Sequence, residues 1–148
     1  YQSWYSNTCI NNSRRPNTYF IFKHTLNLEP YLDNNTNKRF RIALSRFRLS
    51  SHKLEIQRGR YHNTDRENTI CEICNLKAIE NEYHFVLVCP LYRDIRTQYL
   101  TSSYCSWPTL NKFKILLSKQ NKKVTTNLSK YIYHAMNLRN ILEHCYFF

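Results

Sequence analysis

The sequence predicts a mainly α-helical fold: a small helical domain with an embedded Cys3His zinc knuckle and a C-terminal helical hairpin. Three observations predict it. Apolar residues recur at intervals of three and four in several segments. Three cysteines and one histidine between residues 71 and 89 are spaced like metal ligands. The 148 residues suit one domain, whose modest core a bound metal would help to stabilise.

Residues 1–37 are rich in Asn, Ser and Thr, and we expect them to form a weakly ordered polar arm. The chain begins at Tyr1 rather than Met. We therefore expect either a processed product or, by preference, a piece of a longer polypeptide.

Residues 38–60 are predicted to form one basic amphipathic helix. Phe40, Leu44, Phe47, Ser51 and Leu54 are four, three, four and three residues apart, which places them on one helical face. Basic residues flank this apolar seam, and Gly59 is expected to end the helix. The basic residues are Arg39, Arg41, Arg46, Arg48, Lys53, Arg58 and Arg60.

Residues 61–100 are predicted to be a zinc-binding unit. Cys71 and Cys74 form a Cys-x2-Cys pair, and His84 and Cys89 form a His-x4-Cys pair. Zinc prefers four sulfur and imidazole ligands in a tetrahedron, and this set leaves no position for water or substrate, so we expect one structural zinc ion. A disulfide pair, or buried thiols beside an unrelated histidine, is the alternative.

Residues 101–148 are predicted to be a helical hairpin. Leu110, Phe113, Leu116 and Leu117 define one helical face, which Thr109 precedes as an expected N-cap. After a Lys-rich turn, helical spacing resumes from about residue 126 to residue 145.

The charge of the chain favours a polyanionic partner. Lys and Arg number 22 against 10 Asp and Glu, a formal net charge of +12. Nucleic acid is the first candidate and an acidic membrane surface the second, while a charge that merely keeps the chain soluble is the alternative. No apolar run is long enough to cross a membrane, and we expect a nuclear or cytoplasmic protein that is not secreted.

Common catalytic motifs are missing from the sequence. Its single glycine rules out the Gly-rich nucleotide loops and the Gly-x-Ser-x-Gly elbow. No His-x-Glu precedes the Cys-x2-Cys pair, as a zinc deaminase requires, and no His-Glu-x-x-His occurs. We therefore expect neither a catalytic centre nor a small-molecule substrate.

Several segments together resemble a known family, the C-terminal zinc-binding (CCHC, zf-RVT-like) region of non-LTR retrotransposon reverse transcriptases of the LINE type, similar to jockey elements. The segments are Arg46 to Leu54, Gly59-Arg60-Tyr61, Cys71-x2-Cys74, Glu82-Tyr83-His84-Phe85-x3-Cys89-Pro90, and the tail with Lys130-Tyr131-Ile132, Ala135 and Arg139. The resemblance implies a position after a polymerase domain, and a zinc segment that helps to bind template RNA or target DNA. The polymerase's Tyr-x-Asp-Asp pair has no match in this chain.

Two functions follow from these patterns. The first is a structural-zinc module that binds RNA or DNA phosphates without sequence preference, mainly through the basic residues of the 38–60 segment. These residues could also be only the solvated face of a helix. The second is a zinc-stabilised interaction or scaffold module that docks on the upstream polymerase domain.

Overall fold

The computed structural model describes residues 19, 27–34 and 37–146, and within these ranges the chain is mainly helical. The predicted fold class is confirmed, including the Cys3His group within a helical domain. The helical elements are α3 (Pro30–Asn34), α4 (Lys38–Arg48), α5 (Glu55–Tyr61), the 3-10 helix η1 (Arg66–Asn68), the π-helix η2 (His84–Val88), the 3-10 helix η3 (Pro90–Tyr92), α6 (Arg93–Tyr99), α7 (Ser102–Cys105), α8 (Leu110–Ser118) and α9 (Lys122–Tyr146).

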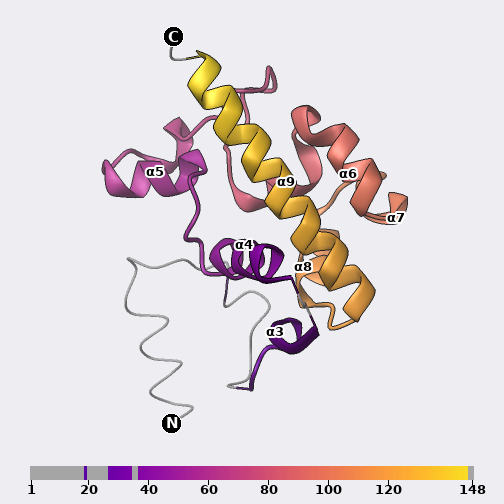
Figure 1. The fold of residues 1–148 in the computed structure, drawn as a ribbon. Coiled ribbons are helices and arrows are strands. Elements are labelled where there is room, and N and C mark those ends of the chain that lie inside the picture. Colours follow the sequence, from indigo (N-terminus) through magenta and orange to yellow (C-terminus); the bar gives the residue numbers. More distant parts are fainter. Residues whose placement is uncertain (1–18, 20–26, 35–36, 147–148) are drawn as a thin grey trace.

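The long helix α9 organises the fold and crosses most of the molecule (Figure 1). It packs against α3, α4 and α6. Leu128, Tyr131, Ile132 and Ala135 recur at intervals of three and one along α9, and all four are buried. Phe85 of η2 contacts this face through the ring of Tyr131, at 6.0 Å between centroids. Helix η2 therefore packs directly against the core.

The two helices predicted for the C-terminal hairpin form as α8 and α9. Thr109 caps α8 as expected, because its Oγ1 accepts a hydrogen bond of 3.2 Å from the backbone N–H of Lys112. Helix α9 begins at Lys122, four residues earlier than predicted. The Asn121 side chain explains the early start, since its Oδ1 accepts hydrogen bonds from the first backbone N–H groups.

The prediction of one helix over residues 38–60 is wrong. The chain forms α4 and α5 with a break at residues 49–54. Ser50 has a φ of 51°, which no α-helix contains, and its hydroxyl donates a 3.0 Å hydrogen bond to the buried Glu82 carboxylate. A contact between segments distant in sequence therefore overrides the helical periodicity.

Gly59 does not end a helix, because α5 continues to Tyr61. Its role is a close approach. A Cβ atom built on Gly59 would lie 2.3 Å from Cγ2 of the buried Thr69, so a larger residue would displace that contact.

The predicted polar arm over residues 1–37 is wrong for residues 30–34, which form α3. Tyr31 is 7% exposed, and its hydroxyl lies 3.1 Å from the Ser45 hydroxyl of α4. Burial of this aromatic ring stabilises a helix that the polar composition conceals. Most of the remaining arm lies outside the described residues.

Candidate metal centre

A short antiparallel turn carries the first two candidate ligands. Ile70 and Ile79 form an isolated β-bridge, and the backbone N–H of Cys71 donates to the carbonyl of Ala78 at 2.9 Å. The intervening loop reverses with Lys77 in the left-handed region, at a φ of 50°. The bridge closes the loop, so that Cys71 and Cys74 face the same side.

A π-helix carries the other two candidate ligands. In an α-helix, side chains five residues apart point about 140° away from each other. In η2 the backbone N–H of Cys89 donates instead to the carbonyl of His84 at 2.7 Å, which closes a wider turn of five residues. The His-x4-Cys spacing thereby brings both side chains to one point.

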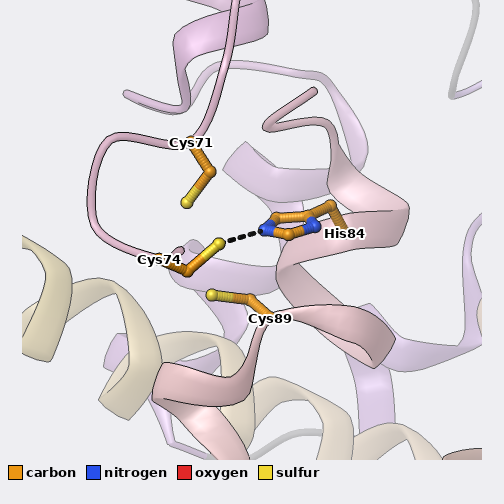
Figure 2. Close-up of side chains that lie close together, drawn as sticks. All are labelled: Cys71, Cys74, His84 and Cys89. Carbon is orange, nitrogen blue, oxygen red and sulfur yellow. Dashed lines mark hydrogen bonds between the residues drawn. The ribbon is translucent and has the colours of Figure 1, made fainter. Parts of the chain in front are cut away.

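The four side chains converge as the sequence predicts (Figure 2). Their sulfur and nitrogen atoms all lie within 4.8 Å of one another. Nε2 of His84 faces the sulfurs and lies 3.4 Å from Sγ of Cys74. Cys71, His84 and Cys89 are buried, while Cys74 is partly exposed. These residues could bind a metal ion.

The proximity and burial of the thiols shift their pKa values. A hydrogen bond to Cys89, together with burial, raises the pKa of Cys71 to about 12. Acceptance of that hydrogen bond lowers the pKa of Cys89. Burial raises the pKa of Cys74. A cation bound among the sulfurs would favour their thiolate forms, because metal ligands bind deprotonated.

Side chains from two helices hold the π-helix by its carbonyl groups. Arg96 of α6 is buried and donates to the carbonyls of Val86, at 2.7 Å, and Cys89, at 2.8 Å. Tyr131 of α9 donates to the carbonyl of Phe85 at 2.7 Å. These bonds satisfy carbonyls at the end of η2 and fix the backbone between the two ligands.

A buried ion pair lies next to Cys71. Glu80 is 1% exposed and Arg139 of α9 is 2% exposed. The guanidinium donates to both carboxylate oxygens, at 3.0 and 2.7 Å. The Cys71 thiol lies 3.8 Å from Oε1 of Glu80, and the backbone N–H of Glu55 at the start of α5 donates to Oε2 at 2.7 Å. Glu80 thus joins the cysteine turn, α5 and α9.

A second buried carboxylate joins the α4–α5 break to η2. Oε1 of Glu82 accepts hydrogen bonds from Ser50 and from Nε2 of His52, each at 3.0 Å. Burial alone would raise the pKa of Glu82, but these bonds and the charge of His52 lower it to about 2. Glu82 therefore connects the break between α4 and α5 to the chain two residues before His84.

Sequence analysis assigned no role to Glu80, Glu82 or Arg96, although Glu82 belongs to one of the segments that carry the resemblance. The two glutamates lie in or beside a polar stretch that has the composition of a solvated loop, and Arg96 lies on a short helix with charged neighbours. Only the charged residue types themselves, flanking the ligands, could have drawn attention to them.

The predicted phosphate-binding residues differ in how far their side chains are exposed. Arg39, Arg46, Lys53 and Arg60 are exposed. Arg41 and Arg58 are partly buried, and Arg58 pairs with Glu55 at 2.9 Å and with Glu143 at 3.1 Å.

Arg48 does not belong to a phosphate-binding surface, and this part of the prediction is wrong. Its side chain is 6% exposed and donates to the carbonyl of Leu117 at 3.2 Å and to Glu29 at 3.2 Å. The guanidinium also lies 4.9 Å from the centroid of the Tyr31 ring. Burial lowers the pKa of Arg48, and the Glu29 charge opposes that effect. The Arg48 guanidinium is therefore occupied by contacts inside the fold.

The remaining cysteines do not join the cluster. Cys105 is partly buried and Cys145 is exposed, and every cysteine in the described ranges is free, which argues against the disulfide alternative there. Cys9 lies outside the described residues. The described helices include none with the length and apolar character of a membrane span.

Comparison of the chain with protein-family models, with curated proteins and with solved structures finds no match.

Proposed function

We propose that this chain is a structural-zinc module that binds nucleic acid, and that it is the C-terminal region of a non-LTR retrotransposon reverse transcriptase. The observation that supports it most strongly is the convergence of Cys71, Cys74, His84 and Cys89, within 4.8 Å of one another.

Zinc is the ion that suits these donors best. A tetrahedral site with the usual zinc bond lengths separates two sulfurs by about 3.8 Å and a sulfur from a nitrogen by about 3.6 Å. The 3.4 Å between Sγ of Cys74 and Nε2 of His84 is close to the second value, and the whole set lies within 4.8 Å. Three thiolates and one imidazole complete the coordination shell, so the ion stabilises the fold and leaves no open position for catalysis.

The exposed cations support nucleic acid as the ligand. Arg39 and Arg46 are two turns apart on α4, and both are exposed, as are Lys53 in the break and Arg60 on α5. Among the described residues, none of these four cations forms an ion pair. Phosphate contacts by such side chains give affinity without sequence preference.

The reverse transcriptase assignment rests on the sequence segments that resemble the family. The described structure agrees with that resemblance in two respects. Cys71 and His84 belong to one cluster, and the tail residue Arg139 is buried against the ligand unit. In this proposal the polymerase catalytic residues would belong to a preceding domain, and this segment would contribute zinc and nucleic-acid binding.

A salt titration of binding tests the proposed function. Fluorescence anisotropy with labelled duplex DNA and with RNA should show affinity that falls steeply as salt rises. The double variant Arg46→Gln, Lys53→Gln should weaken binding and reduce the salt slope by about 1.8, since each phosphate contact contributes about 0.9.

A matched control removes the same charge elsewhere. Arg66 and Arg93 are also exposed but lie outside the proposed surface. The double variant Arg66→Gln, Arg93→Gln should leave the slope close to that of the natural chain. Absence of binding at low salt, binding that salt does not affect, or equal losses in the two double variants would argue against the proposal.

A scaffold function is the second candidate, and exposed apolar residues on α4 and at its C-cap favour it. Ile42 is 38% exposed and Leu49 is 55% exposed, and they alternate with Arg39 and Arg46. A module that docks on the polymerase domain should bind that domain in a pull-down and lose binding in Leu49→Ser. A chain that binds RNA but shows no affinity for the polymerase domain contradicts this second candidate.

A further inference from the structure

An exposed tryptophan lies in the loop between α7 and α8. Trp107 is 89% exposed and has a φ of 51°, a backbone conformation that is unfavourable for residues other than glycine. Such a conformation persists only where neighbouring contacts enforce it. Apolar exposure and backbone strain at one residue point to a role outside the core.

The loop is anchored on both sides of Trp107. The Tyr83 hydroxyl donates a 3.0 Å hydrogen bond to the carbonyl of Pro108, and the Lys112 ammonium donates to the carbonyl of Ser106. Tyr83 packs edge-on against Phe113 of α8, with 5.9 Å between ring centroids. The backbone that carries the indole is therefore fixed, and the indole itself stays in solvent.

The surroundings of Trp107 are cationic. Between Ile95 and Leu142 the sequence contains six lysines and no Asp or Glu, and its two arginines, Arg96 and Arg139, are buried in the contacts described above. The Lys112 ammonium contacts the residue before Trp107, and the Lys119 ammonium lies 5.8 Å from the ring centroid of Tyr104 in α7, just before the same loop.

We propose that this surface, formed by Trp107 with Lys112 and Lys119, binds single-stranded nucleic acid. The indole stacks on an unpaired base and the ammonium groups contact the flanking phosphates. A duplex hides its base faces in the stack, so an exposed aromatic ring beside cations selects single strands. The proposal extends the proposed function by adding a second surface, distinct in sequence from Arg39, Arg46, Lys53 and Arg60.

Tryptophan fluorescence of the full zinc-loaded chain tests the proposal. The chain has two tryptophans, so Trp4→Phe leaves Trp107 as the sole reporter. An oligothymidine of about 12 nucleotides, within the usual site size, should quench this emission. Trp107→Leu should weaken binding of the oligothymidine by about 5- to 160-fold, the range expected for loss of one stacked base. Its affinity for duplex DNA should not change.

The controls separate this surface from the first. Leu is not β-branched and tolerates the left-handed backbone about as well as Trp, and circular dichroism should confirm an unaltered fold for Trp107→Leu. The Trp107 quench should persist in Arg46→Gln, Lys53→Gln. If that double variant binds duplex normally while Trp107→Leu loses the oligothymidine, the first surface fails and the second stands.

Two results would overturn the proposal. One is unchanged oligothymidine binding in folded Trp107→Leu. The other is quenching of Trp107 by vesicles of phosphatidylserine with none by oligothymidine, which would assign the surface to an anionic membrane.

Discussion

Loss of the Arg139 guanidinium should destabilise the protein severely. Arg139→Met keeps an unbranched chain of similar length but removes both hydrogen bonds to Glu80, which is 1% exposed. Removal of one partner from a buried ion pair costs about 3 to 5 kcal/mol, because the other charge stays buried and unpaired. Glu80 keeps the backbone N–H of Glu55 at 2.7 Å, so we expect the lower part of that range. Small domains have only about 5 to 15 kcal/mol of stability in total.

Urea unfolding at a fixed excess of zinc measures this cost, since bound metal contributes to stability and must be held constant. Arg58→Met is the matched control, because Arg58 belongs to the same network but its side chain is 39% exposed. We expect it to cost less than about 1 kcal/mol. Adding Glu80→Gln to Arg139→Met should recover part of the lost free energy of unfolding, because it removes the unpaired buried charge. Equal costs for Arg139→Met and Arg58→Met would refute the reasoning.

Gly59→Ala should destabilise by about 1 to 3 kcal/mol through the clash with Cγ2 of Thr69, and Thr69→Ser, which removes that methyl group, should rescue it in urea unfolding. A penalty that Thr69→Ser does not relieve would contradict the close-approach argument. Cys74→Ser should abolish zinc-dependent cooperative folding, seen by circular dichroism, whereas Cys105→Ser should be mild; similar effects would count against the cluster. Arg96→Met should lower zinc affinity by about 10- to 100-fold in chelator competition, because it removes the hydrogen bonds that Arg96 donates to the carbonyls of Val86 and Cys89 in the turn between the ligands. Unchanged zinc affinity would show that Arg96 does not position the ligands.

Local patterns accounted for the parts of the structure that depend on local physics. The spacing of Leu110, Phe113, Leu116 and Leu117 predicted α8 because one helical face is buried there. The Cys-x2-Cys and His-x4-Cys spacings predicted which four side chains meet. They did not predict the π-helix, although the five-residue separation requires a turn wider than an α-helix.

The errors arose where distant contacts decide the outcome. Arg48 belongs to the same pattern of basic residues as its exposed neighbours. The carbonyl of Leu117, 69 residues later, nevertheless accepts its hydrogen bond inside the fold. The break after α4 depends on Ser50 reaching Glu82, 32 residues away. Helical periodicity carries no information about such partners, so residues 38–60 read as one helix.

X-ray absorption at the zinc edge, combined with metal analysis of the purified chain, tests the central claim most directly. One zinc ion per chain, bound by three sulfurs and one nitrogen, is the predicted result, with Cys74→Ser losing it. A chain that folds without stoichiometric metal, or a zinc ion with mainly oxygen ligands, would contradict the account.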